Sequence, residues 1–301
     1  MKKQLIVRIA EGLGNQLFMY SNAYALSKEN NFDLFIDNKS GFFKNKDIRN
    51  YELNNFNISS QICSNQFKYS SYKSDLKRKL MLQIDKFKKN KSFLIEKKDS
   101  TKKTKFYNLI NDFKLNDSFI VEGHFESEKY FINYQKELQS EFSLIDETKY
   151  KNNQYYNSVN QDNIISICIR KNRFSERIKP NNLQKNKSNL FIRDTIAYIK
   201  KAECFIETKI INPIYYVWSD DFSGLREFFP ENKYNFIDNK NNKTLNDFFL
   251  MTQCKNFIVG PTTFHWWGAW LSKKENKICV RPKDLNPSNN SDFWPNSWVS
   301  I

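Results

Sequence analysis

The chain has 301 residues and a formal net charge of +15, and 40% of its residues are hydrophobic and 16% aromatic. This apolar content can build a sizeable core, which excludes a disordered chain, and the length allows one large domain or two of ordinary size. The charge invites a nucleic-acid partner, but no DNA- or RNA-binding motif accompanies it, so we expect no nucleic acid.

Cysteine and histidine are too few and too dispersed to suggest a metal centre. The five cysteines are an odd number with no close pair, so they predict neither a disulfide framework nor a zinc site, and they fit a reducing compartment. The chain begins with a strand too short to be a signal-peptide core, and it has no apolar run of membrane-spanning length. We therefore expect a cytoplasmic protein, either soluble or at the inner face of the cytoplasmic membrane.

The first predicted unit is a strand, a turn and a helix. Residues 5–9 form an apolar strand, Gly12 and Gly14 follow it, and an aromatic-rich helix comes next. This order is that of a Rossmann-type unit, although the third glycine of the dinucleotide fingerprint is absent. Glycines let the backbone approach a ligand closely, and the amides of Asn15 and Gln16 suit sugar hydroxyls.

Residues 76–89 form a predicted basic amphipathic helix. Its apolar residues at helical spacing are Leu76, Leu80, Ile84 and Phe87. The basic residues among them are Lys77, Arg78, Lys79, Lys86, Lys88 and Lys89. The pattern has two interpretations, because such a helix can bind a membrane surface or pack its apolar stripe on its own domain.

A second strand, over residues 119–123, leads into a polar segment that contains His124 and Glu126. A helix follows and closes the first half of the chain. The polar, Asn-rich stretch 152–162 is the best candidate for a linker between the two halves.

Two predicted strands of the second half end in charged residues. Strand 164–169 leads into Arg170 and Lys171, at the carboxyl end of the strand, where α/β sheets bind ligands. The planar guanidinium of Arg170 suits a pyrophosphate bidentately. Strand 215–219 ends at Ser219 and is followed by Asp220 and Asp221, a pair that could bind a metal ion.

The stretch 244–271 predicts a helix, a strand, a turn and a second helix. Thr244 is a plausible cap of the first helix, with Asp247 three residues on as in a capping box. Pro261 ends the strand, and Thr262 or Thr263 caps the second helix. Its N-terminus is suited to an anion. The alternative is that these polar residues are only helix caps.

The segment 247–271 resembles the C-terminal signature of the glycosyltransferase family 11 fucosyltransferases. The matching residues are Asp247, Leu250, Met251, Cys254, Ile258, Thr263, Phe264, Trp266, Trp267, Gly268, Ala269, Trp270 and Leu271. Pro261 and His265 replace the Asn and second Ser of the signature. Residues 11–18 resemble the family's G-G-L-G-N-Q-L-F with Glu11 in place of the first Gly.

One family motif is altered. At H-x-R-R-x-D, Arg170 and Lys171 keep the two charges, while Cys168 and Arg173 replace the His and the Asp. Loss of that Asp removes a carboxylate with a possible acid, base or orienting role.

The resemblance implies an α/β fold of the GT-B type, with two Rossmann-like domains facing a cleft. Residues 1–151 are expected to form the acceptor-side domain and residues 163–301 the nucleotide-sugar-binding domain. The implied reaction is inverting transfer of L-fucose from GDP-fucose to a hydroxyl of a surface polysaccharide or oligosaccharide, usually as an α-1,2 link. We expect no metal and no other cofactor, and the acceptor can be lipid-linked.

The resemblance also implies roles for individual residues. The residues expected at the donor are Arg170, Lys171, Ser219, Asp221, Asp247, Thr262, Thr263, Phe264 and His265. The residues expected on the acceptor side are Gly12, Gly14, Asn15, Gln16 and His124. We expect Arg170 to assist catalysis and Asp247 to read the guanine edge. The nearby candidates for a catalytic carboxylate are Glu11, Glu126 and Glu176, none of which matches a residue of the family's motifs.

Three other functions stay open at this point. The protein could use another GDP-sugar, because Pro261 and His265 lie near the expected donor position. It could also be an inactive GDP-sugar-binding homologue, because the H-x-R-R-x-D motif is altered. A nucleic-acid binder rests on charge alone.

Overall fold

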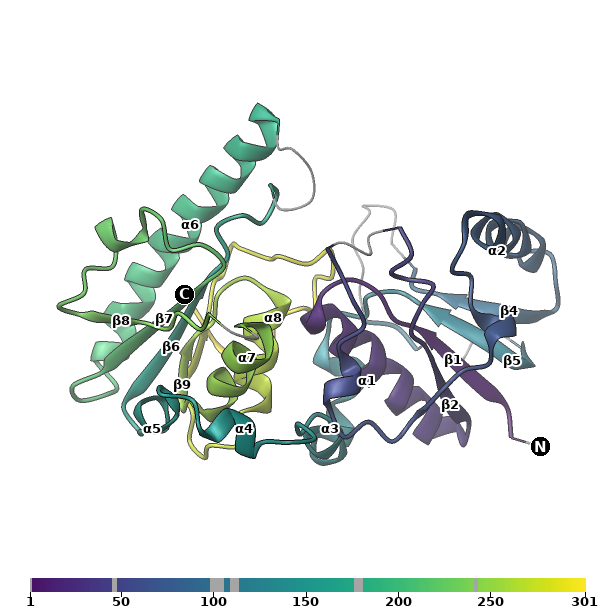
Figure 1. The fold of residues 1–301 in the computed structure, drawn as a ribbon, viewed down its shortest axis with the longest axis horizontal. Coiled ribbons are helices and arrows are strands. Elements are labelled where there is room, and N and C mark those ends of the chain that lie inside the picture. Colours follow the sequence, from purple (N-terminus) through teal and green to yellow (C-terminus); the bar gives the residue numbers. More distant parts are fainter. Residues whose placement is uncertain (1, 45–47, 98–105, 109–113, 176–180, 241–242) are drawn as a thin grey trace. The chain divides into compact units, whose positions relative to one another are not determined.

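The computed structural model describes all residues except 1, 45–47, 98–105, 109–113, 176–180 and 241–242 (Figure 1). The described chain divides into two compact units. Unit 1 contains residues 1–145 and 288–295, and unit 2 contains residues 146–287 and 296–301. The division differs from the expected boundaries of 1–151 and 163–301, because a segment near the C-terminus belongs to unit 1.

Unit 1 is a five-stranded parallel sheet with helices packed on it. Its strands are β1 (Gln4–Arg8), β2 (Asp33–Asp37), β3 (Gln61–Ile62), β4 (Asn90–Ile95) and β5 (Lys114–Glu122), in the order β3-β2-β1-β5-β4. Helix α1 (Leu13–Asn30) packs against β1 and β2 and buries most of its surface. The sheet therefore reverses its strand order between β1 and β5, at the loops that follow these two strands.

The remaining elements of unit 1 are short or peripheral. They are α2 (Tyr72–Asp85), α3 (Gln135–Glu141) and the 3₁₀ turns η1 (Leu53–Asn55), η2 (Asn65–Phe67), η3 (Glu128–Tyr130) and η4 (Ile132–Tyr134). The C-terminal segment joins this unit through Phe293, whose ring lies 6.1 Å from that of Phe18 in α1, and through an ion pair of 2.7 Å between Asp292 and Lys129.

Unit 2 is a six-stranded parallel sheet built around a fully buried strand. Its strands are β6 (Ile164–Ile169), β7 (Ile214–Ser219), β8 (Tyr234–Phe236), β9 (Asn256–Ile258), β10 (Cys279–Arg281) and β11 (Val299–Ser300), in the order β11-β10-β9-β6-β7-β8. Its helices are α4 (Thr148–Lys151), α5 (Tyr156–Val159), α6 (Asn182–Glu207), α7 (Lys243–Gln253) and α8 (Thr263–Leu271), with one 3₁₀ turn, η5 (Leu225–Glu227). The strand order reverses between β6 and β9.

The expected linker 152–162 is a folded part of unit 2. Tyr156 in this stretch stacks on Phe249 of α7 with ring centroids 5.9 Å apart, and Asn153 donates a hydrogen bond of 2.8 Å to the side chain of Asn239. The linker prediction is wrong because it relied on the polar composition of the stretch, whereas Tyr156 packs the stretch against α7. Within the described ranges, no helix is both long and apolar enough to cross a membrane.

Candidate functional site

The most constrained part of unit 2 is the turn that follows β9. In open α/β sheets, ligands bind outside the carboxyl ends of the strands where the strand order reverses, here between β6 and β9. Gly260 lies at this point against Cys168, near the end of β6. A Cβ at Gly260 would lie 1.9 Å from the carbonyl oxygen of Cys168. Only glycine therefore lets the turn pass so close to the end of the central strand.

The side chain of His265 joins this turn to β6 through two hydrogen bonds. Its Nδ1 accepts a hydrogen bond of 2.8 Å from the Gly260 N–H, and its Nε2 lies 2.9 Å from the hydroxyl of Ser166 in β6. Burial lowers the pKa of the imidazole to about 3, so it is neutral. Because Nδ1 accepts, the proton is on Nε2. The side chain, which the sequence predicts at the donor, is fully buried, and both of its ring nitrogens are used within the protein.

Thr262 caps α8 and orients its N-terminus. Its hydroxyl accepts a hydrogen bond of 3.1 Å from the His265 N–H, as the sequence predicts for a cap. The next two residues, Thr263 and Phe264, are half-buried. Among the described residues no acceptor is bonded to their backbone N–H groups. These donors and the helix dipole can stabilise an anion above the turn.

The loop after β6 is held by the aspartate pair that follows β7. Asp220 accepts hydrogen bonds from the backbone N–H groups of Lys171 (2.6 Å) and Asn172 (3.0 Å). The Lys171 ammonium bonds Asp221 at 3.0 Å, and the Ser219 hydroxyl donates to the Asp221 carbonyl at 2.8 Å. The pair thus fastens the residues next to Arg170. No group of three or more potential metal ligands occurs among the residues described.

Asp247 is a buried carboxyl on the first turns of α7. It accepts one hydrogen bond, of 2.7 Å, from the amide of Asn239, which is itself held by Asn153. Burial raises the pKa of Asp247 to about 7, and the bond from Asn239 opposes the rise. The predicted capping box with Thr244 is wrong. Helix α7 begins at Lys243, so Thr244 lies inside the helix and is not its cap, and the Asp247 carboxylate bonds Asn239.

Four charged groups act on the buried thiol of Cys168, near the carboxyl end of β6. Burial raises the pKa of Cys168 well above its usual range, and the carboxylates of Asp220 and Asp247 raise it further. The positive charges of Arg170 and Lys243 oppose that rise. These four charged groups therefore share the carboxyl end of β6, and Arg170 lies half-buried directly after the strand.

Sequence reasoning missed Lys243 of this group and Asn239, the hydrogen-bond partner of Asp247. The Lys243 ammonium donates a hydrogen bond of 2.8 Å to the carbonyl of Ser219, at the end of β7. Asn239 precedes the helix in a loop without a recognisable motif. Only the fold brings Asn239 and Lys243 beside Asp247, so their types and spacing carried no signal.

Arg173, which replaces the family's Asp, has a structural role. Its guanidinium donates a hydrogen bond of 3.0 Å to the carbonyl of Pro261 and a second one to the carbonyl of Pro287. It also lies over the ring of Phe191 at 4.9 Å. The altered motif therefore ties the β6 loop to the turn before α8.

In unit 1, Gln16 has the same kind of role as His265. Its amide donates to the carbonyls of Glu11 (2.9 Å) and Asn50 (2.8 Å), and its oxygen accepts from the Glu52 N–H at 2.9 Å. Its side chain, which the sequence predicts on the acceptor side, is fully buried and is used within the protein. Asn15 is half-buried in the first turn of α1.

The glycine motif before α1 differs from its family form in one strained residue. Gly12 caps α1 with a φ of −79°, which any residue can adopt, and Gly14 is buried in the helix. Glu11 instead has a φ of 65°, in the left-handed region that favours glycine. The family's first glycine is explained by this backbone angle.

The other candidate carboxylate of unit 1 follows β5. Glu126 is half-buried and accepts a hydrogen bond from the Ser288 hydroxyl. His124 is exposed, and its backbone N–H donates to Glu96 at 2.8 Å. Glu11 and Glu126 thus both lie on loops at the reversal of the unit 1 sheet, while Glu176 lies outside the described residues.

Known proteins resemble this chain over its whole length. The family model described as Glycosyl transferase family 11 matches residues 3–301. The chain belongs to glycosyltransferase family 11. An alpha-1,2-colitosyltransferase of Escherichia coli is 25% identical over 306 residues, covering 99% of this chain and 98% of the relative. The O-antigen biosynthesis glycosyltransferase WbnK of Escherichia coli is 27% identical over 309 residues, covering 97% and 99%.

Solved structures show that the fold of this glycosyltransferase is that of GT-B fucosyltransferases. NodZ alpha-1,6-fucosyltransferase soaked with GDP-fucose has a TM-score of 0.51 at 13% identity, covering 90% of this chain and 93% of NodZ. A mutant of Arabidopsis thaliana FUT1 in complex with GDP has a TM-score of 0.55 at 14% identity, covering 95% and 72%. The expected α/β fold of the GT-B type is confirmed.

Proposed function

We propose that this glycosyltransferase transfers L-fucose from GDP-fucose to a sugar hydroxyl, in an α-1,2 link and with inversion. The acceptor is an oligosaccharide of a surface polysaccharide such as an O antigen. The main support is the cluster at the carboxyl end of β6, where Arg170 and the N-terminus of α8 are built around one fixed turn. The family and the nucleotides named for its structural neighbours are consistent with a GDP-linked donor.

Catalysis in this proposal is electrostatic. When the glycosidic bond to the donor breaks, negative charge moves onto the pyrophosphate of the leaving GDP. Arg170 offers a bidentate guanidinium, and the N–H groups of Thr263 and Phe264 offer two further donors. Because Thr262 caps the helix and Asp220 anchors the backbone next to Arg170, these groups would stabilise the developing charge with little reorganisation. We propose that they do so without a metal ion.

Asp247 is the proposed reader of the base. Guanine presents an N–H and an amino group on one edge, and a carboxylate accepts from both. Asp247 is largely removed from water, and Asn239 fixes one of its oxygens. Hydrogen bonds to a desolvated carboxylate are strong, so the proposal predicts a marked preference for guanine nucleotides.

A second candidate donor is GDP-colitose. It is favoured by the colitosyltransferase relative, which aligns with nearly the whole chain. Replacement of two signature residues by Pro261 and His265 does not decide between the sugars, because His265 is buried and acts on the turn.

The test is release of GDP from a panel of donors, namely GDP-fucose, GDP-colitose and GDP-mannose, with and without excess chelator. Turnover of GDP-fucose in chelator supports the proposal. A clear preference for GDP-colitose would show that the donor is GDP-colitose and not GDP-fucose. GDP binding without turnover of any donor would show a binding protein. Loss of turnover in chelator with recovery in Mg²⁺ or Mn²⁺ would contradict the metal-free chemistry.

A further inference from the structure

Helix α2 packs Met81 and Leu82 against the core of unit 1, but most of its large apolar side chains, and that of Phe87 just after the helix, lie on the outside. Five large residues, spaced three or four apart, face solvent with between 48% and 91% of their surface exposed. They are Tyr72, Leu76, Leu80, Ile84 and Phe87, which we call the apolar stripe. This spacing places them along one side of the helix. The alternative that the stripe packs on its own domain is therefore wrong.

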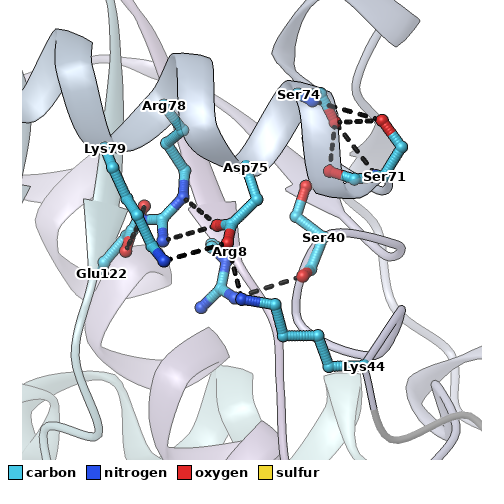
Figure 2. A network of polar contacts seen from close by, with 9 residues as sticks. All are labelled: Arg8, Ser40, Lys44, Ser71, Ser74, Asp75, Arg78, Lys79 and Glu122. Atoms are coloured by element: carbon cyan, nitrogen blue, oxygen red, sulfur yellow. Dashed lines mark hydrogen bonds and ion pairs between the residues drawn. The ribbon is translucent and has the colours of Figure 1, made fainter.

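The charged residues of α2 instead hold the helix to the sheet of unit 1 (Figure 2). Asp75 is buried and accepts from Lys44 at 2.6 Å and from Arg78 at 3.1 Å. The Arg78 guanidinium reaches both carboxylate oxygens of Glu122, at the end of β5, at 2.8 Å. Arg78 thus faces inward, contrary to its expected place among the exposed basic residues.

The C-terminal end of α2 is anchored in the same way. The carboxylate of Asp85 accepts from the backbone N–H groups of Ser92 (2.8 Å) and Phe93 (3.2 Å), both within β4. With acids bound at both ends of the helix, α2 cannot turn its stripe inward without leaving two carboxylates unpaired. The outward apolar face is therefore a fixed property of the fold.

The exposed charged residues of the segment 72–89 all have one sign. The exposed basic residues are Lys73, Lys77, Lys79, Lys86, Lys88 and Lys89, which we call the lysine rim. The acids of this segment, Asp75 and Asp85, are both buried. An apolar stripe with a lysine rim complements a surface that is apolar inside and anionic outside. A second copy would oppose one lysine rim to another, and nucleic acid would leave the stripe exposed.

We propose that the apolar stripe and the lysine rim bind α2 in the plane of an anionic phospholipid bilayer. The helix spans about 21 Å along this surface, at 1.5 Å per residue. The side chains of the stripe would enter the boundary of the acyl chains, and the lysines would contact lipid phosphates. This surface goes beyond the transfer reaction and would hold the enzyme where lipid-linked acceptors are found.

The test is co-sedimentation of the full chain with vesicles of phosphatidylglycerol in phosphatidylcholine, compared with phosphatidylcholine alone. One variant combines Leu76→Ser, Leu80→Ser and Phe87→Ser, and the other combines Lys73→Gln, Lys77→Gln, Lys88→Gln and Lys89→Gln. The matched controls are Ile145→Ser with Ile211→Ser, which are 64% and 86% exposed elsewhere, and Gln at four exposed lysines. Those four are Lys185, Lys187, Lys201 and Lys209.

The wild type should prefer the anionic vesicles, and its binding should fall with salt. Each rim lysine is worth about fivefold at such a surface, so the four-lysine variant should lose more than about a hundredfold at low salt. The serine variant should lose binding at low and high salt alike, whereas both controls should bind as the wild type does. Melting temperature and release of GDP with a soluble acceptor should stay unchanged in every variant, so this test is independent of the donor assay.

Two outcomes would overturn the proposal. One is equal binding of the wild type to both kinds of vesicle. The other is a concentration-dependent dimer that the serine variant dissolves, without a preference for anionic vesicles, because the stripe would then be covered by a second copy.

Discussion

The turns after β1 and β9 are built on one plan but are stabilised differently. Each joins a strand at the reversal of its sheet to a helix, and each is braced by a fully buried polar side chain from the first turn of that helix. Gln16 in unit 1 bonds backbone groups of two loops, whereas His265 in unit 2 joins the turn to the central strand. In both turns the buried polar side chain thus positions the backbone.

The largest expected effect on transfer comes from replacing Arg170, the cation at the carboxyl end of β6. Arg170→Ala should reduce transfer about 100- to 1000-fold, or about 2.7–4 kcal/mol, because an electrostatic donor to the leaving group is lost. Arg170→Lys should restore little, since a point charge cannot replace the bidentate guanidinium. The measurement is turnover with melting temperature as the folding check, and near-wild-type transfer would remove the main support for the proposed site.

The control for this experiment is Arg193→Ala. Arg193 is exposed on α6 and, within the described part of the chain, bonds only the neighbouring Asp194. Sequence comparison alone would favour Arg173→Ala as the neutral control. Its hydrogen bond to Pro261 makes that variant unsuitable, because it would disturb the turn.

The two braces can be compared directly. His265→Ala and Gln16→Ala each leave buried backbone groups without a partner, so each should destabilise the fold by about 2–3 kcal/mol in urea unfolding. GDP affinity should fall in His265→Ala because the turn below the α8 N-terminus loosens, and should be retained in Gln16→Ala. Equal losses of GDP affinity would mean that the two turns do not differ in function.

The pH dependence of GDP binding reports on Asp247. With its pKa at about 7, the carboxylate that accepts from guanine is lost on acidification, so affinity should fall about tenfold per unit below that pH. Asp247→Asn should remove this slope. Stability has the opposite sign: the folded pKa lies above the ordinary value of 3.8, so this group's contribution falls as pH rises from there to about 7. Titration calorimetry across this range gives the measurement, and an identical slope in Asp247→Asn would assign it to another group.

The smallest effect is expected at the strained residue of the first turn. A non-glycine residue in the left-handed region costs about 1–2 kcal/mol, and glycine costs up to about 1 kcal/mol in chain entropy. Glu11→Gly should therefore stabilise the protein by about 0.5 kcal/mol. If Glu11 is the catalytic base, this variant will lose transfer while melting higher, and Glu11→Gln will lose transfer as well.

The sequence was sufficient for the central strands of both sheets, whereas β2, β3, β4 and β11 were not predicted. Strand 164–169 is found at its predicted residues, and Thr262 caps α8 as expected. Hydrophobic runs and caps are local, so they can be recognised without the fold. The burial of Gln16 and His265 could not be foreseen, because both types are usually exposed or partly exposed and their partners are distant in sequence.

Two other features needed the fold for a related reason. The periodicity of α2 predicts an amphipathic helix, but it does not say which side faces the protein. The side that faces the protein is set by the hydrogen bond from Arg78 to Glu122, which lies 44 residues later in the chain. The extra segment of unit 1 likewise depends on contacts of Phe293 with α1, which no local pattern indicates.

The return of residues 288–295 to unit 1 has a consequence for biosynthesis. Chains emerge from the ribosome from the N-terminus, and domains usually fold in that order. Unit 1 lacks Phe293 and the Asp292 partner of Lys129 until nearly all of unit 2 has been made. Neither unit can therefore be completed before the other has been translated. A premature stop that removes only the last segment would deprive both units of native contacts at once.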